Sequence, residues 1–213
     1  MNPIAITKKG WLFLLSVAVL FILVTILAVL TAYTDPLSLA IRLFALYGFT
    51  ALAIATSMTP FLKEITQALG RSFLKIHHLF AISGLVFATL HPVSFAISQM
   101  DLTVFLPRFD SWQIFWELAG RPALYILYIA AIAALLRSMI PKYWRYFHAL
   151  MYIVLTFVIA HGNLFGTDFQ NLGILIIMNA LFVISVSAFF LKRYQYYQRK
   201  QRAKTKRVQK SEK

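Results

Sequence analysis

Residues 76–100 read IHHLFAISGLVFATLHPVSFAISQM, a stretch that contains three histidines but no Asp, Glu, Lys or Arg. As an α-helix it would be about 37 Å long, which exceeds the roughly 30 Å of hydrocarbon in a bilayer. A second uncharged stretch, residues 146–167, contains His148 and His161. The two stretches predict transmembrane helices that together carry all five histidines of the chain.

The rest of the chain has the same apolar character. Of its 213 residues, 60% are hydrophobic and only 13% are charged, whereas about 25% are charged in a typical soluble domain. Further uncharged stretches cover residues 11–33, 43–62 and 169–191. A sixth stretch, about residues 119–140, has Arg121 and Arg137 near its ends, where long side chains can reach the two membrane surfaces. We predict an all-α integral membrane bundle of six transmembrane helices.

The distribution of charge predicts how the bundle is oriented. The chain has 21 Lys and Arg against seven Asp and Glu, a net charge of +14. With the N-terminus in the cytoplasm, 18 of the 21 basic residues fall on that side, and the outer side keeps Arg42, Arg108 and Arg121 together with five acids. This bias follows the positive-inside rule, so the protein is expected in the cell inner (plasma) membrane with both termini on the cytoplasmic side. The distribution of the basic residues is therefore explained by the orientation of the helices in the membrane, and no nucleic-acid partner is expected.

The chain divides into a membrane part and a tail. Residues 1–191 are expected to form the six-helix transmembrane domain. Residues 192–213 hold ten of the basic residues and are expected to form a cytoplasmic tail that is too polar to pack a core and frays.

The spacing of the histidines indicates paired ligands. His77 and His91 are 14 residues apart, so on a helix they lie about 21 Å apart along the axis and about 40° apart around it. His148 and His161 are 13 residues apart, about 20 Å along the axis. In parallel helices His77 is then level with His148. His91 is likewise level with His161.

Each level offers two neutral imidazoles across an apolar gap. This arrangement is typical of a b-type haem held between helices by two axial histidines. The chain has no Cys, which excludes covalent haem attachment, Cys-ligated zinc and iron–sulfur clusters. The pattern predicts two haems, bound by His77 with His148 and by His91 with His161, that carry electrons across the membrane.

One feature of the second histidine pair conflicts with an ideal helix. Thirteen residues turn an α-helix by about 220°, so His148 and His161 share a face only if the helix bulges, tilts or uses two flanks. Gly162 is a candidate position for such an adjustment. The same difficulty applies to His78, whose separation from His91 equals that between His148 and His161, so the ligand is assigned to His77.

Other chemistries fit these residues less well. A zinc site needs three or four ligands that converge on one metal ion, whereas the histidines lie at two levels. A proton relay would favour Asp or Glu near the middle of a span, and the sequence has none there. The alternative hypothesis is a cofactor-free membrane protein whose histidines serve packing or proton transfer.

Two arginines are candidate partners for the haem propionates, because a guanidinium binds carboxylates well. Arg121 lies on the outer side, where the charge rule does not explain it, and Arg145 lies near the inner pair. The outer loop, about residues 101–118, is a candidate docking surface for an electron acceptor. Its acids are Asp101, Asp110 and Glu117.

Two motifs carry a family resemblance. IHHLFAISGLVFATLH (residues 76–91) and YWRYFHALMYIVLTFVIAH (143–161) resemble the paired-histidine helices of the ferric reductase-like transmembrane domain, over about residues 40–190. Within that group the chain looks closest to the haem-binding membrane subunit of the periplasmic protein-methionine-sulfoxide reductase system. The supporting features are its size, the lack of an appended flavin domain, MTPFLKEI at 58–65 and GRPALY at 120–125. That subunit's usual paired Arg followed by Leu-Gly-Leu is replaced here by residues 77–81, HHLFA.

The resemblance implies a function and partners. It implies two b haems ligated by the four paired histidines, with FMN or a quinone as a further candidate cofactor. Electrons would arrive from a cytoplasmic flavin reductase or a quinol and leave to a periplasmic molybdopterin reductase subunit or to ferric ion. The chain would then be the electron-transfer subunit of an oxidoreductase of the ferric reductase or methionine sulfoxide reductase type.

Overall fold

The computed structural model describes residues 6–31 and 35–211, with side chains up to residue 202. Every regular element in these ranges is helical, which confirms the predicted all-α class. The elements in chain order are α1 (Lys8–Leu30), α2 (Pro36–Ser57), η1 (Thr59–Phe61), α3 (Leu62–Leu69), α4 (Phe73–Gln99), η2 (Leu102–Phe105), α5 (Trp112–Glu117), α6 (Gly120–Leu135), α7 (Trp144–His148), α8 (Met151–Phe165), η3 (Thr167–Gln170) and α9 (Leu172–Ser211).

Five helical segments are long and apolar enough to cross a membrane. They are α1, α2, α4, the segment Trp144–Phe165 that joins α7 to α8, and Leu172–Arg202 of α9. α6 is apolar but has only 16 residues, about 24 Å as a helix. The sixth predicted stretch, 119–140, thus contains a shorter helix, because residues 136–143 form tight turns. Residues 32 and 33 of the first predicted stretch lie outside the described residues.

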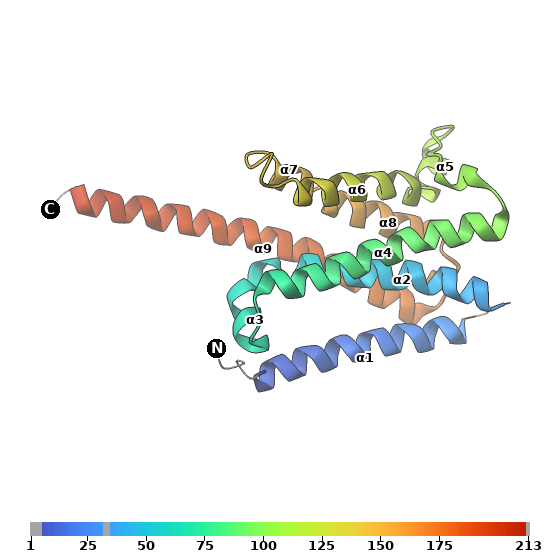
Figure 1. Ribbon diagram of the computed structural model, residues 1–213, viewed down its shortest axis with the longest axis horizontal. Helices are drawn as coiled ribbons and strands as arrows, with labels where there is room; N and C mark the ends of the chain where they lie inside the picture. Colours follow the sequence, from blue (N-terminus) through green and yellow to red (C-terminus); the bar gives the residue numbers. More distant parts are fainter. Residues whose placement is uncertain (1–5, 32–34, 212–213) are drawn as a thin grey trace.

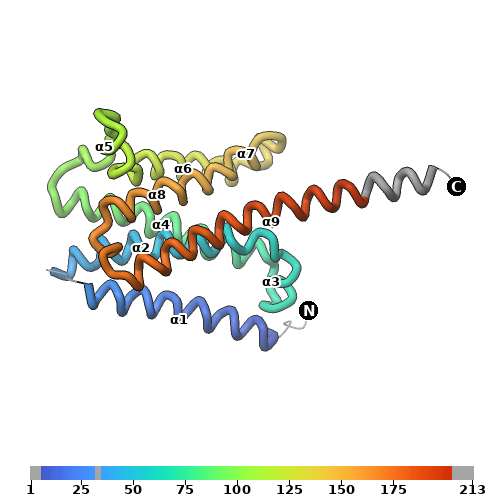
Figure 2. Tube along the Cα trace, turned by 180° about the vertical axis from the view of Figure 1, so that it is seen from behind, coloured from blue at the N-terminus to red at the C-terminus, as the bar shows by residue number. Residues whose placement is uncertain are grey.

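The helices form two antiparallel pairs with further helices beside them. α2 packs along most of α4, and α6 packs along α8. In Figure 1, α1 lies along one edge of the bundle and α6 and α8 lie along the opposite edge, with α2, α4 and α9 between them. Figure 2 shows the same order from behind. The start of α1 and the projecting part of α9 lie at the same end of the bundle.

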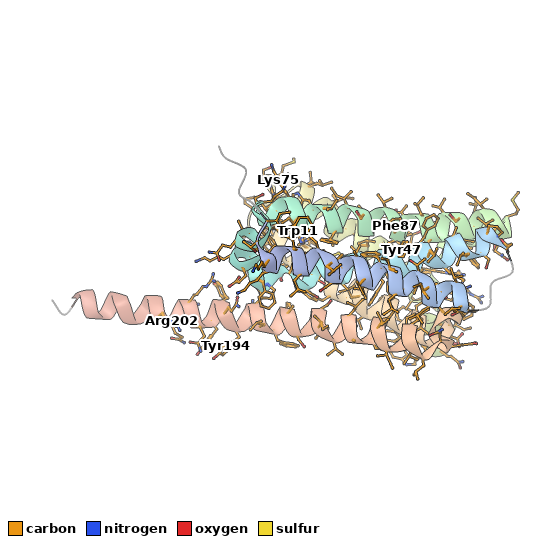
Figure 3. All side chains as sticks on the ribbon, turned by 90° about the horizontal axis from the view of Figure 1, so that it is seen from below. Trp11, Tyr47, Lys75, Phe87, Tyr194 and Arg202 are labelled. Carbon is orange, nitrogen blue, oxygen red and sulfur yellow. The ribbon has the colours of Figure 1, made fainter. Side chains whose placement is uncertain are left out.

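The first antiparallel pair makes an unusually close crossing. A Cβ added to Gly48 of α2 would lie 2.8 Å from the backbone nitrogen of Ala88 in α4, and one added to Gly84 would lie 2.7 Å from the Leu52 side chain. Small residues let membrane helices approach each other closely. Beside this crossing the rings of Tyr47 and Phe87 pack edge to face, with 5.6 Å between their centroids (Figure 3).

The basic tail differs from expectation. α9 continues as one helix from Leu172 to Ser211 and projects beyond the bundle, so the tail does not fray in the part of the chain that is described. Its residues are mostly Lys, Arg, Gln and Ala, which are strong helix formers. The side chains of Tyr194 and Arg202 extend from this projecting part (Figure 3). The tail thus keeps a helical backbone beyond the bundle.

The Gly48 crossing leads to the first testable prediction. We expect Gly48→Ala to lower the free energy of unfolding by about 1–3 kcal/mol, because the new methyl group meets backbone that has no rotamer to relax. Titration with a denaturing detergent would measure the change. Ala18→Val, which adds methyl groups on the exposed face of α1, is the control and should have little effect. Equal losses in both variants would contradict the prediction.

Candidate functional site

The two histidines of α4 are held in the same way by α2. Nδ1 of His77 lies 3.1 Å from the carbonyl oxygen of Ala55, and Nδ1 of His91 lies 2.9 Å from that of Ile41. Ala55 is near the end of α2, and Ile41 is near its start. Because the helices are antiparallel, the two imidazoles are oriented at opposite ends of one helix pair.

The two histidines of the second pair repeat this arrangement. Nδ1 of His148 lies 3.3 Å from the carbonyl oxygen of Ala130 in α6. Nδ1 of His161 makes a short hydrogen bond to the carbonyl oxygen of Glu117, at the end of α5. Backbone carbonyls of α2 therefore orient the two imidazoles of α4, and carbonyls of α6 and α5 orient the imidazoles of α7 and α8.

The local sequence leaves the Glu117 carbonyl available. α5 ends at Glu117 and α6 begins at Gly120, so the helical hydrogen-bond pattern is interrupted between them. The amide of Arg121, which would reach the Glu117 carbonyl in a regular helix, donates instead to the carbonyl of Leu118 at 3.0 Å. Pro122 has no amide hydrogen to contribute. The break between α5 and α6 thus provides the acceptor that orients His161.

At the inner level the two imidazoles lie close together, edge to face. The ring centroids of His77 and His148 are 6.3 Å apart, with 78° between the ring planes. A metal ion bound on opposite sides to one nitrogen of each ring would separate the ring centres by about 6 Å, because the distance from each nitrogen to its ring centre adds to the two metal–nitrogen bonds of about 2 Å. Phe73 stacks on His77 with 5.5 Å between centroids. The inner pair has the spacing that one shared metal ion requires.

At the outer level the two imidazoles line one cavity. His91 and His161 belong to the walls of a cavity of about 860 Å³ between α2, α4, α6 and α8. This volume is in the usual range for cofactor pockets. A Cβ on Gly120 would lie 3.1 Å from the His161 ring, so the small residue makes room for the imidazole. Most of the remaining wall is aliphatic and aromatic.

The helix that carries His148 and His161 is interrupted between them. α7 ends at His148 and α8 begins at Met151, and the amides of Leu150 and Tyr152 donate to carbonyls three residues earlier. Such 3₁₀ turns rotate about 120° per residue instead of 100°. The two residues between α7 and α8, Ala149 and Leu150, would change the rotation from about 220° to about 260°, which brings the two histidines closer to the same face.

The prediction that this adjustment occurs at Gly162 is wrong. Gly162 is the position expected from the sequence, but it lies within a regular part of α8. A Cβ there would lie 2.6 Å from the ring of Phe169, so Gly162 is needed for close packing of η3 on α8. The overwound turn occurs instead beside His148, at the inner end of the helix.

The fifth histidine differs from the four paired ones. His78 is exposed, and its ring centroid lies 6.0 Å from that of His77. The other four are half-buried, and their hydrogen bonds within the described ranges all use Nδ1 and none uses Nε2. This difference supports the choice of His77 over His78.

The two predicted arginines have different surroundings. Arg121 lines the outer cavity, and its Nη1 donates to the carbonyls of Thr103 and Leu106 at 3.0 and 2.9 Å. It therefore also connects the start of α6 to the η2 segment, of which Val104 and Phe105 line the cavity. Arg145 lies away from this cavity, and its guanidinium packs over the ring of Trp144 at 5.4 Å. Trp144 in turn lies 6.2 Å from His148, so Arg145 is near the inner pair.

Acids of the outer loop are engaged in local structure. Oδ1 of Asp101 accepts the amide hydrogen of Thr103 at 2.8 Å, and Asp110 pairs with Arg108 at 2.8 Å. Hydrogen bonds from Thr103 hold the pKa of Asp101 below its usual value, and a hydrogen bond from Arg108 does the same for the pKa of Asp110. Both carboxylates remain charged at neutral pH, but each already has a nearby partner.

Sequence reasoning missed one charged pair at the cavity. Arg42 and Asp168 both line its outer part and form a salt bridge, with side chains only 11% and 9% exposed. Both residues are among the charged residues that the sequence predicts on the outer side of the membrane. However, they are 126 positions apart, and no local pattern connects them.

Donor chemistry limits what the site can hold. Within residues 6–31 and 35–202, no three His, Asp or Glu side chains gather where they could bind one metal ion. The ligands come in pairs, which suits a metal ion whose remaining positions are supplied by a macrocycle. Comparisons with known protein families, curated proteins and solved structures gave no match to this chain. The resemblance of the two histidine motifs therefore stays a prediction.

The contrast between His77 and His78 is testable. We expect His77→Ala to remove about half of the haem content predicted from the sequence, since the inner pair would lose one of its two predicted ligands. His78→Ala should leave the haem content unchanged. A pyridine haemochromogen assay per mole of protein measures both. Haem loss in the His78 variant alone would reverse the assignment.

Proposed function

We propose that this chain is a transmembrane electron carrier that binds two b-type haems, one between His77 and His148 and one between His91 and His161. The observation that carries the proposal is the repeated arrangement of four imidazoles. They form two levels, and a backbone carbonyl of a neighbouring helix holds Nδ1 in every case. When bound, a haem supplies an iron that alternates between ferric and ferrous states and so carries one electron.

The carbonyl contacts determine which nitrogen is the ligand. A neutral imidazole has one N–H donor and one nitrogen that can accept a hydrogen bond or bind a metal. When Nδ1–H donates to a carbonyl, Nε2 carries the free lone pair. The same contact fixes the ring orientation. Each helix pair therefore prepares two imidazoles for metal binding through Nε2.

The spacing of the two levels suits transfer across a membrane. His77 and His91 both belong to the continuous helix α4 and lie about 21 Å apart along its axis. This distance covers about two thirds of the hydrocarbon core. In this proposal α6 is the sixth span. The basic end, where α1 begins and α9 projects, lies in the cytoplasm.

The proposed partners follow from the proposed direction of transfer. A cytoplasmic flavin reductase or a quinol would supply electrons near the inner pair, where Arg145 and Trp144 lie. A periplasmic molybdopterin reductase subunit or ferric ion would accept electrons near the outer cavity. In this function the chain is the electron-transfer subunit of an oxidoreductase, with Arg121 and Arg145 as propionate partners.

The haem content of the purified protein tests the proposal most directly. We expect a Soret band, the α band of a low-spin b haem after reduction, and about two haems per chain. His161→Ala should remove one haem and leave the inner one, because each level depends mainly on its own ligands. Colourless protein from haem-replete cells would exclude the proposal and favour histidines that serve packing or proton transfer.

Transfer across a bilayer is a separate prediction. We expect the protein in sealed vesicles to reduce trapped ferricyanide when dithionite is added outside, at a rate at least tenfold above that of protein-free vesicles. His91→Ala should reduce this rate to the background, since the outer level is needed to reach the far surface. Absorbance of the trapped ferricyanide measures the rate. Fast reduction by the His91 variant would contradict a path through both levels.

A further inference from the structure

The salt bridge between Arg42 and Asp168 connects three parts of the outer half. Nε of Arg42, in α2, donates to Oδ1 of Asp168 in η3 at 2.9 Å, and Nη2 contacts the same oxygen. Nη2 also donates to the carbonyl of Ala28 in α1 at 2.8 Å. The pair is thus a fixed, well-connected element of the outer cavity wall.

This pair lies next to a proposed haem ligand. Arg42 directly follows Ile41, whose carbonyl holds Nδ1 of His91 at 2.9 Å. Arg42, Asp168 and His91 all line the same cavity. Asp35 and Arg121 also line it, so the two further charges of the mouth are of opposite sign. A charge in this wall acts on the outer level through a medium of low dielectric constant.

A contribution to the stability of the fold does not by itself explain a buried salt bridge of this kind. Removing two charges from water costs free energy that their attraction often only offsets, so a buried salt bridge is weak evidence for a stabilising role. The exposed pair Arg108–Asp110, whose side chains are 54% and 53% exposed, shows what an ordinary surface ion pair looks like in this chain. Water and salt screen that pair, whereas they screen the buried pair much less.

We propose that the charges of Arg42 and Asp168 act on the reduction potential of the outer haem level in opposite directions and, as a salt bridge, nearly cancel. The inference rests on the proposed haem function. Ferric haem carries one more positive charge than ferrous haem, so a nearby carboxylate favours the oxidised form and a nearby guanidinium favours the reduced form. Held in one salt bridge, the two side chains balance each other at a fixed position beside His91. Both are positioning residues for electron transfer and are not ligands.

Single substitutions should shift the potential in opposite directions. We expect Asp168→Asn, which keeps a side-chain oxygen to accept from Arg42, to raise the equilibrium constant for reduction of the outer haem about tenfold. For one electron this is about 59 mV. Arg42→Gln should lower the constant by about the same factor. The double variant should return within about threefold of the wild-type value. Redox titration followed by absorbance measures these constants.

Matched controls separate charge from structure. The component that His161→Ala removes identifies the outer haem in the titration, and the inner component should not move in any variant. Asp110→Asn and Arg108→Gln break the exposed pair and should leave both potentials unchanged. Arg42→Lys keeps the positive charge with different geometry and should keep the wild-type potential.

Several results would overturn the inference. They are a wild-type potential in Asp168→Asn, shifts of the same sign in both single variants, and an Arg42→Lys shift as large as that of Arg42→Gln. An Asp168→Asn protein that folds but lacks the outer haem would show that the pair only braces the site. Wild-type protein without two haems would instead refute the proposed function, so the two failures are distinguishable.

Discussion

An imidazole inside a membrane depends on a partner for its N–H group, because hydrocarbon offers none and an unpaired polar group there costs several kcal/mol. In this bundle the partner is always a backbone carbonyl of a helix packed against the one that carries the histidine. The position of α2 against α4, and of α5 and α6 against α7 and α8, therefore decides where each ring points. The close crossing at Gly48 is needed for these hydrogen bonds, because a wider separation of the two helices would move the carbonyls of α2 away from the rings of α4.

The two helix pairs are equivalent in their spacing. The sequence separation between Ile41 and Ala55, whose carbonyls are the acceptors on α2, equals that between the two histidines that they hold. The separation between Glu117 and Ala130 likewise equals that between their two histidines. Each pair thus works as a unit that presents one imidazole near each end, and two units facing each other form both levels. The correspondence lies in backbone acceptors of any residue type, so no sequence repeat reveals it.

Much of the fold was predictable from the sequence because lipid demands long uncharged helices. The five longest stretches and the choice of His77 over His78 rested on length and rotation per residue, which are simple geometry. Two features depend on contacts between distant segments and were not predictable. These are the Arg42–Asp168 pair and the carbonyl partners of the histidines. The basic tail is helical because many of its residues have a high helix propensity, and the predicted fraying did not take this propensity into account.

The spacing of the histidines is one position shorter in the second pair than in the first, and the overwound turn between α7 and α8 compensates for part of this difference. In regular helix, the shorter spacing would leave His161 about 1.5 Å short of the level of His91, and on the wrong face. A 3₁₀ residue rises about 2.0 Å instead of about 1.5 Å. The two residues between α7 and α8 add about 1 Å of rise and about 40° of rotation. The overwound turn thus moves His161 both along the axis and around it toward His91, and the two imidazoles line one cavity.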